Sequence, residues 1–334
     1  MVAVARSTRA SRIGLLGLAI LVAILASAPY WAGSSNMRLM GEIFAYIALA
    51  SLWNLLAGYA GLVSVGQHAY VGLGGYVLFA LAMFLGVHPL VAVGLAGVAA
   101  AIVAVPAAFL LFRLKGAYFA IGSWVLAEVA LLLFARVSAL GGGSGTSLPI
   151  TVVRDIADGR SAREAVTYWT ALLIVVVVVG GITLLLRSRL GLALTAIRDS
   201  EVASRSLGVR ITRVKLAVYV AAAAGAGAVG ALIFLTKLRI SPDAAFSLSD
   251  WTALVIFITV IGGVGRIEGP LVGTAVFFLL RETLADYGAL YLIALGVVAI
   301  LIMLFAPRGL WGAFAARTGL EIFPLQRRVI APRE

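Results

Sequence analysis

Several side chains that could take part in chemistry lie inside long apolar stretches of this sequence. Gln67 and His68 interrupt NLLAGYAGLVSVGQHAYVGLGGYV (54–77), and Glu128 stands in the middle of IGSWVLAEVALLLF (121–134). Polar groups in a hydrophobic interior are costly, so they usually face a cavity or a partner group. We interpret Gln67 and His68 as lining a wet space, with a packed, hydrogen-bonded ring as the alternative for His68. Glu128 could meet a proton, a cation or an ammonium group, or could make an interhelical hydrogen bond.

Other kinds of site are disfavoured. Gly61 and Gly66 have the spacing of a phosphate-binding G-x-x-x-x-G-K-[ST] loop, but Gln67 and His68 follow in place of Lys and Ser/Thr. The chain has no cysteine and two histidines, so we find no zinc site of standard spacing, no thiolate site and no disulfide. No set of nucleophile, acid pair or metal ligands is apparent, so we expect no cofactor, no metal and no catalytic residue.

The composition places these residues in a membrane. Apolar residues make up 63% of the chain and charged residues 12%, with a mean hydropathy of +1.10. A soluble domain is about half apolar and a quarter charged. Because backbone amides in hydrocarbon need internal partners, long unbroken apolar runs predict an all-α integral membrane protein. The formal net charge is +12, and the charged residues lie between the apolar runs. This position indicates basic cytoplasmic loops rather than a nucleic-acid partner.

The apolar runs predict a polytopic bundle of about ten transmembrane helices, because a span needs about 20 mainly apolar residues. Those near the centre of the bundle are expected to be broken or short, with 251–264 and 270–284 the shortest. The predicted spans are 13–32, 39–57, 68–86, 89–112, 117–136, 167–186, 214–236, 251–264, 270–284 and 288–306.

Lys and Arg predict the orientation. With ten spans and both termini inside, 18 of the 26 basic residues fall in cytoplasmic segments, as the positive-inside rule requires. The predicted organisation is a cytoplasmic segment 1–12, a membrane domain 13–306 and a cytoplasmic tail 307–334. LASAPY (25–30) could instead end a cleaved signal peptide, but the apolar run is long for one, and Pro29 is a poor context for cleavage.

Two loops stand out within the membrane domain. The outer loop, 137–166, contains GGGSGTSLP (141–149), in which glycines and a proline prevent a helix. In the inner loop, 187–213, residues Leu192–Leu207 alternate between alanine-rich and charged sides at helical spacing, and Gly208 stands where a helix C-cap belongs. This predicts a short amphipathic helix that rests on anionic lipid or packs into a groove of another protein.

A second glycine-interrupted stretch, IGGVGRIEGPLVG (261–273), matches the one at 54–77. Such a pair, one in each half of a chain, points to a translocation site, because broken helices expose backbone groups to a cavity. The alternative is that the glycines only allow close helix packing. The candidate pathway residues are Gly61, Ser64, Gly66, Gln67, His68, Gly72, Tyr118, Trp124, Glu128, Gly262, Gly263 and Gly265.

Four stretches together resemble the LivM-type permease subunits of bacterial ABC importers for branched-chain amino acids. Phe305–Gly312, FAPRGLWG, and the outer GGGSGTSLP fit as well, so the resemblance covers most of residues 40–312. The stretches are NLLAGYAGLVSVGQHAYVGLGGYV, FRLKGAYFAIGSWVLAEV (112–129), AIRDSEVASRSLGVRITRVKLAVYVAAAAGAGAVGAL (196–232) and IGGVGRIEGPLVGTAVFFLL (261–280).

The resemblance implies a passive gate in a bacterial inner membrane, driven by partners. Residues 192–208 would be a coupling helix that docks into a cytoplasmic ATPase subunit. The implied partners are two ATPase subunits, a second, LivH-type permease and a periplasmic solute-binding protein that loop 137–166 would help receive. The coupling residues would be Arg198, Asp199, Glu201, Leu207 and Gly208.

One departure from the family pattern leaves the solute open. Ser123 and Trp124 follow GAYFAI, where the family more often has a Thr-Leu-type stretch, and an indole could reshape the passage. Urea, amides and aromatic or short acyl solutes are therefore alternatives to branched-chain amino acids. A stand-alone secondary transporter or channel coupled through Glu128 is a second class of function, and a membrane enzyme is the least favoured.

Overall fold

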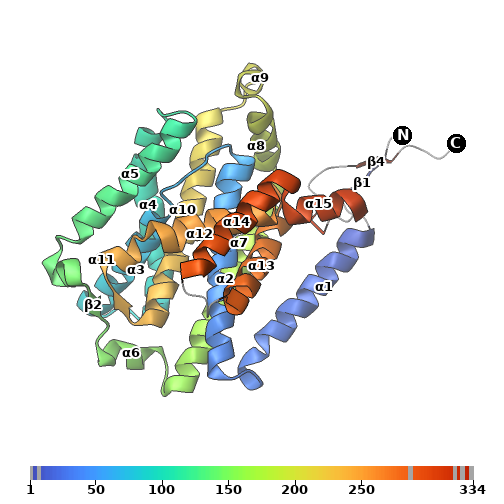
Figure 1. Cartoon of the computed structure of the whole chain (residues 1–334). Helices are drawn as coiled ribbons and strands as arrows, with labels where there is room; N and C mark the ends of the chain where they lie inside the picture. Colours follow the sequence, from blue (N-terminus) through green and yellow to red (C-terminus); the bar gives the residue numbers. More distant parts are fainter. Residues whose placement is uncertain (1–2, 6–8, 285–288, 319–321, 324–327, 331–334) are drawn as a thin grey trace.

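The computed structural model describes residues 3–5, 9–284, 289–318, 322–323 and 328–330, which are almost entirely helical (Figure 1). Its α-helices are α1 (Arg9–Ala26), α2 (Ser34–Asn54), α3 (His68–Phe84), α4 (Pro89–Leu111), α5 (Ala117–Phe134), α6 (Ile150–Ile156), α7 (Arg160–Arg187), α8 (Arg189–Asp199), α9 (Glu201–Ser206), α10 (Ile211–Lys237), α11 (Pro242–Ala245), α12 (Leu254–Gly262), α13 (Glu268–Leu284), α14 (Ala289–Phe305) and α15 (Gly309–Thr318).

Shorter elements connect these helices. Two are π-helices, η2 (Leu55–Tyr59) and η5 (Leu248–Ala253). Three are 3₁₀ turns, η1 (Ala28–Tyr30), η3 (Ser138–Leu140) and η4 (Gly142–Ser144). Strand β1 (Ala3–Ala5) pairs antiparallel with β4 (Arg328–Ile330), and β2 (Thr146–Ser147) pairs antiparallel with β3 (Arg239–Ile240).

The apolar runs fold as the sequence predicts, since each of the ten predicted spans contains a helix. Within the described residues, seven segments are long and apolar enough to cross a membrane. Gly17–Tyr30 and α3 are apolar but shorter, and α13 carries charges at both ends. The helical membrane fold is therefore confirmed, whereas the count of ten spans stays a prediction.

The centre of the bundle is built by α3, α4 and α10, whose contact surfaces are made of small residues. A Cβ added to Gly74 of α3 would lie 1.9 Å from the carbonyl oxygen of Gly227 in α10. One added to Gly230 would lie 2.1 Å from the carbonyl oxygen of Val71. Glycine at these positions lets the two backbones touch, which is how membrane helices gain packing contact without a hydrophobic driving force.

The two loops singled out in the sequence lie at opposite ends of the bundle. Figure 1 shows α8 and α9 projecting from one end, and α6 and β2 at the other. Pairing of β1 with β4 places the described ends of the chain side by side, which fits an even number of spans. The outer loop is more ordered than predicted: it contains η3, η4, β2 and α6, and α7 begins at Arg160. Which end faces the cytoplasm stays a prediction.

Candidate functional site

The first glycine-rich stretch is a broken helix, as predicted. Segment 60–67 leaves η2 and enters α3 without regular helical structure, and Gly61 has the positive φ of +67° that glycine tolerates best. The Nε1 of Trp53 donates a hydrogen bond to the carbonyl oxygen of Ser64 at 2.7 Å. On the other side, the backbone N of Val65 donates to Oγ of Ser123 in α5 at 2.9 Å. Side chains of two helices therefore replace the missing helical bonds.

Gln67 and His68 are both buried and hold this break to the interior of the bundle. Gln67 donates from Nε2 to the carbonyl oxygen of Leu49 at 3.1 Å. Nδ1 of His68 lies 2.8 Å from Oγ1 of Thr252 in η5, and the same hydroxyl accepts from the His68 backbone N. Oε1 of Gln67 and Nε2 of His68 have no hydrogen-bond partner among the described residues. In the structure His68 is a packed, hydrogen-bonded ring. A contact between His68 and a solute stays a prediction.

Two other predicted residues of this stretch serve close packing. A Cβ on Gly66 would lie 1.9 Å from the carbonyl oxygen of Ser123, so α5 is pressed directly against the break. A Cβ on Gly72 would lie 2.5 Å from the ring of Phe246. These positions exclude any larger side chain because backbone and a buried ring occupy the space.

The two glycine-interrupted stretches meet in the structure, a contact that the sequence did not predict. Asn54, which is buried, accepts a hydrogen bond from the backbone N of Gly265 and donates one to the carbonyl oxygen of Arg266, both at 2.7 Å. Gly58 packs so closely that an added Cβ would lie 2.5 Å from the Gly265 backbone N. We call this contact the glycine joint: Asn54, Gly58, Gly265 and Arg266.

The neighbouring glycines of the second stretch anchor the C-terminal helix. Gly263 has φ +126° and Gly265 φ +79°. A Cβ on Gly262 would lie 1.8 Å from the carbonyl oxygen of Gly269, and one on Gly309 would lie 2.3 Å from the Cα of Gly263. The start of α15 therefore rests on the turn between α12 and α13, beside the glycine joint.

The inner loop reaches the glycine joint through one side chain. Nη1 of Arg198, near the end of α8, donates a hydrogen bond to the carbonyl oxygen of Gly58 at 3.2 Å. Nε of Arg198 also lies 3.7 Å from Oδ1 of Asp199, whose side chain is largely exposed. Arg198 therefore links the inner loop to the point where the two broken stretches touch.

The single amphipathic helix predicted for Leu192–Leu207 is wrong in one respect, because the segment forms two helices. Ser200 ends α8 in an extended conformation, and its side chain accepts from the backbone N of Ala203 as the N-cap of α9. Gly208 ends α9 with φ +81°, in line with its predicted role as a cap. The buried face differs in part: Ile197 of the predicted apolar side is buried, together with Leu194, whereas Ala203 and Leu207 of that side are exposed.

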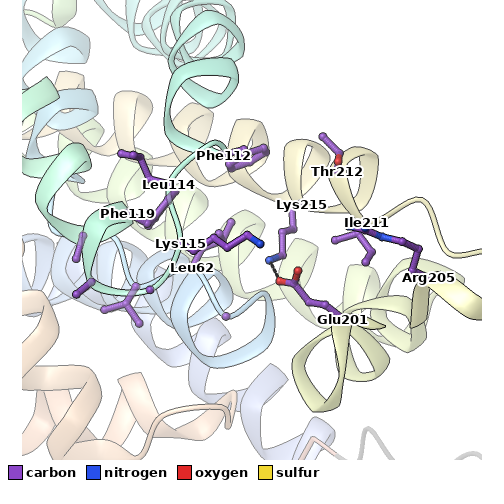
Figure 2. A pocket seen from close by; sticks show the side chains of 15 residues that line it. Leu62, Phe112, Leu114, Lys115, Phe119, Glu201, Arg205, Ile211, Thr212 and Lys215 are labelled. Carbon is purple, nitrogen blue, oxygen red and sulfur yellow. Dashed lines mark hydrogen bonds and ion pairs between the residues drawn. The ribbon is translucent and has the colours of Figure 1, made fainter. Parts of the chain in front are cut away.

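A hollow of about 540 Å³ opens between the break, the start of α5 and the inner loop. Figure 2 shows Lys115 and Lys215 reaching into it, with Lys215 paired to Glu201. Of the predicted residues, Gly61 and Glu201 line it. Its remaining lining is mainly apolar, and consists of Leu62, Val63, Phe112, Leu114, Gly116, Ala117, Phe119, Ala120, Arg205, Ile211 and Thr212.

The charges around this hollow favour small anionic or zwitterionic groups. Lys115 and Arg205 carry no ion pair within the described part of the chain, and a single carboxylate, Glu201, opposes three cations. Clefts lined by one sign of charge attract the opposite sign. Among the described residues, no three His, Cys, Asp or Glu side chains come together as metal ligands would.

The predicted residues of α5 do not join this interior set. Tyr118 and Trp124 are exposed on the outward side of α5, and Glu128 beside them is partly exposed. The Nε1 of Trp124 donates a hydrogen bond to Oε1 of Glu128 at 2.9 Å. The candidate residues thus separate into an interior set around the break, the glycine joint with its neighbours, and an outward set on α5.

Comparison with known families decides what kind of protein carries this arrangement. Residues 36–307 match the family described as the permease component of the branched-chain amino acid transport system. The chain belongs to this permease family. Membership points to transport and away from enzymatic activity.

Relatives of the permease carry the same description. This chain is 29% identical over 317 residues to the LivM high-affinity branched-chain amino acid transport permease of Salmonella typhimurium, and 28% identical to that of Escherichia coli. Each match covers 88% of this chain and 74% of the relative. A probable LivM of Methanocaldococcus jannaschii is 25% identical, over 80% of this chain and 86% of its own. No solved structure matches the chain.

Sequence reasoning missed three residues that hold the permease together at its breaks. Asn54, Ser123 and Thr252 each bond across the fold to a segment of the break or the glycine joint. Each is a small polar residue within an apolar stretch, which is a usable signal. The signal does not name the partner, because the bonded groups lie 58 to 211 residues apart in the chain.

Proposed function

We propose that this permease is one membrane-spanning subunit of an ABC importer. It passes branched-chain or related amino acids from a periplasmic binding protein to the cytoplasm. Two cytoplasmic ATPase subunits drive it, and a second, LivH-type permease completes the membrane part. The match of residues 36–307 to the permease family carries this proposal.

The inner loop supports the part played by the ATPase subunits. Val202 and Leu207 of the α8–α9 segment are 79% and 80% exposed. Apolar side chains exposed this far on a projecting segment suit a hydrophobic groove of another protein. Arg198 of the same segment bonds to Gly58, so force applied to the loop reaches the broken helices. Residues 192–208 therefore act as the coupling segment. The end of the bundle that carries the inner loop, 187–213, faces the cytoplasm.

The substrate follows from the relatives, with one qualification from this chain. The LivM proteins are named for branched-chain amino acid transport. Trp124 departs from the family pattern and stands next to Glu128 on α5. An amino acid with an apolar side chain suits both groups, because the carboxylate can pair with an ammonium group and the indole can cover an apolar chain.

Uptake by the reconstituted complex tests the proposal. The permease, its sister permease and the two ATPase subunits are placed in proteoliposomes with binding protein outside, and radiolabelled leucine, phenylalanine and urea are compared. We expect ATP inside the vesicles to drive uptake of leucine. Uptake driven by a pH gradient without the ATPase subunits would instead establish a secondary transporter, and ATP-driven uptake of urea alone would overturn the substrate.

The coupling segment is tested with a matched pair of charge insertions. Leu207→Glu changes an exposed side chain of the inner loop, and Leu85→Glu changes one that is 71% exposed just after α3, away from the inner loop. We expect Leu207→Glu to release the ATPase subunits during purification and Leu85→Glu to retain them. Equal retention by both variants would contradict the coupling role of this segment.

A further inference from the structure

The hollow of Figure 2 contains more positive charge than its ion pairs balance. Lys115, in the connection between α4 and α5, and Arg205 of α9 both line it, and neither forms an ion pair within the described part of the chain. Lys215 of α10 also lines the hollow, and its ammonium group is paired with Glu201. The hollow therefore holds two unpaired cations, which come from two different segments.

The ends of three apolar helices place this hollow at the surface of the membrane. Its wall includes Phe112, directly after α4, Phe119 in the first turn of α5, and Ile211 at the start of α10. Each of these helices is long and apolar enough to cross a bilayer. Where such helices begin and end, the hydrocarbon core meets the layer of lipid headgroups. The hollow therefore lies at the depth of the headgroups.

The wall of the hollow adds apolar surface to this charge. Leu62 and Val63 of the break line it, and so does Leu114 in the α4–α5 connection. Val63 and Leu114 are 49% and 38% exposed, so their apolar side chains are open to a ligand. Burial of such surface is favourable. A ligand that fits both parts of the hollow carries an anionic group and an apolar chain.

A free amino acid and a nucleotide fit this hollow less well. The ammonium group of an amino acid would meet cations, because Glu201, the one carboxylate among the described lining residues, is already paired with Lys215. Gly61 of the stretch with phosphate-loop spacing lines the hollow, but Gln67 and His68 stand where that loop needs Lys and Ser/Thr. A phospholipid of net negative charge matches both the cations and the apolar wall.

We propose that this hollow binds the headgroup of an anionic phospholipid, and that the bound lipid joins the inner loop to the start of α5. The phosphodiester accepts hydrogen bonds from the guanidinium of Arg205 and the ammonium group of Lys115, and the acyl chains lie along the apolar wall. Basic pockets between membrane helices on the cytoplasmic side suit such headgroups. The site goes beyond the importer function proposed above, and the binding of lipid does not depend on that function.

A lipid bound in this way acts on the segments that lead to the glycine joint. Arg205 belongs to the α8–α9 segment, whose Arg198 donates to the carbonyl oxygen of Gly58. Lys115 precedes α5, which is packed on the break at Gly66. One headgroup in contact with both cations fixes these two segments relative to each other. Transport is therefore expected to depend on the fraction of anionic lipid in the membrane.

Photo-crosslinking of lipid to the assembled complex tests the site. The permease, its sister permease and the ATPase subunits are placed in phosphatidylcholine nanodiscs that contain a probe lipid with a diazirine in its acyl chain. The probe is either phosphatidylglycerol or phosphatidylcholine, and peptide mapping locates the label. We expect phosphatidylglycerol to label the α4–α5 connection and the start of α5 at least about fivefold more than phosphatidylcholine does.

A matched pair of double variants separates the hollow from the general charge of the membrane surface. Lys115→Gln with Arg205→Gln removes the two unpaired cations of the hollow. Arg113→Gln with Arg213→Gln removes two exposed cations nearby that are not among the lining residues. We expect the first pair to lower phosphatidylglycerol labelling at least about tenfold, and the second by less than about twofold. Lys115→Arg with Arg205→Lys keeps both charges and should retain the label.

Uptake measures the consequence for transport. In proteoliposomes with binding protein outside and ATP inside, leucine uptake by the wild-type complex should rise at least about threefold as phosphatidylglycerol replaces phosphatidylcholine. The variant with Lys115→Gln and Arg205→Gln should lose most of this rise, and the variant with Arg113→Gln and Arg213→Gln should keep it.

Each other outcome overturns a stated part of the proposal. Equal labelling of the two double glutamine variants would show attraction by surface charge alone and would overturn the site. Displacement of the probe by inorganic phosphate at constant ionic strength would assign the cations to a soluble phosphate, and displacement by leucine would assign the hollow to the solute; either result would overturn the lipid.

The uptake results keep this proposal distinct from the importer. If the hollow is labelled but uptake by the wild-type complex does not change with phosphatidylglycerol, the effect of lipid on the inner loop is wrong. If the hollow is labelled and the wild-type complex takes up no solute with ATP, the importer is overturned and the lipid site stands.

Discussion

Replacing Asn54 by leucine should weaken the glycine joint without leaving a cavity, because the two side chains have a similar branched shape. The change removes two hydrogen bonds of 2.7 Å, one from the backbone N of Gly265 and one to the carbonyl oxygen of Arg266. A hydrogen bond contributes about 0.5–1.5 kcal/mol net, so the free energy of unfolding should fall by about 1–3 kcal/mol. Both backbone groups are only partly buried, which keeps the loss within this range.

The assay is an SDS titration of the purified permease in mixed micelles, which reports the free energy of unfolding. Asn36→Leu is the matched control, since Asn36 is exposed in the first turn of α2 and should change stability by less than about 0.5 kcal/mol. A loss of about 1–3 kcal/mol corresponds to a factor of about 5–160 in the unfolding equilibrium.

A second measurement tests whether the glycine joint couples ATP hydrolysis to transport. In proteoliposomes, Asn54→Leu should lower the number of leucine molecules taken up per ATP hydrolysed, because the two broken stretches are no longer held together. If Asn54→Leu and Asn36→Leu have the same stability and the same stoichiometry, the two bonds contribute nothing and the reasoning about the joint fails.

Three further predictions concern other contacts. Gly66→Ala should lower the yield and stability of the folded permease because its Cβ would lie 1.9 Å from a backbone oxygen of α5. Gly94→Ala, which has open space around it, should raise the free energy of unfolding by up to about 1 kcal/mol. Thermal unfolding in detergent compares the two variants. Arg198→Ala should leave ATP hydrolysis in place and reduce uptake, and equal losses of both would refute a coupling role. The bidentate pair of Arg281 with Glu42, at 2.7 and 2.8 Å, is partly exposed, so Glu42→Gln should cost less than about 1 kcal/mol; a larger loss in the same SDS titration would contradict this.

The sequence was sufficient for the helical membrane fold and for the helix breaks. Apolar length decides whether a segment can lie in a membrane, and clustered glycines at 58–75 and 262–273 mark where helices are interrupted. Both are local properties of the chain. The partners that hold each break are not local: Asn54 and Gly265 are 211 residues apart, so composition and spacing could not join them.

The division of the inner loop could have been predicted more closely. Ser200 and Glu201 form a local helix start, with a side chain that caps a backbone N three residues later. The continuous alanine-rich pattern masks this signal, because taken alone it predicts one helix. Which of its apolar residues are buried depends on how α8 docks on the bundle, and the pattern alone does not contain that information.

The orientation of α5 was the part of the candidate site that the sequence could not supply. The helix is apolar on every side except at Glu128 and small polar positions, so periodicity does not choose an inward face. The sequence predicts Tyr118, Trp124 and Glu128 as pathway residues. The structure places them outward, because Ser123 and Gly66 fix the other side of the helix to the break.

The two π-helices, η2 and η5, give the bundle a place where helical register can change. A π turn spans one residue more than an α turn. Conversion of a π turn into an α turn would therefore shift the following chain by about 1.5 Å along the helix axis and rotate it by about 100°. Each turn is fastened from outside: Arg198 bonds to Gly58 within η2, and His68 contacts Thr252 within η5. Both contacts are formed in this conformation. A change of helical register at η2 therefore requires the Arg198–Gly58 hydrogen bond to break, and one at η5 requires the His68–Thr252 contact to break.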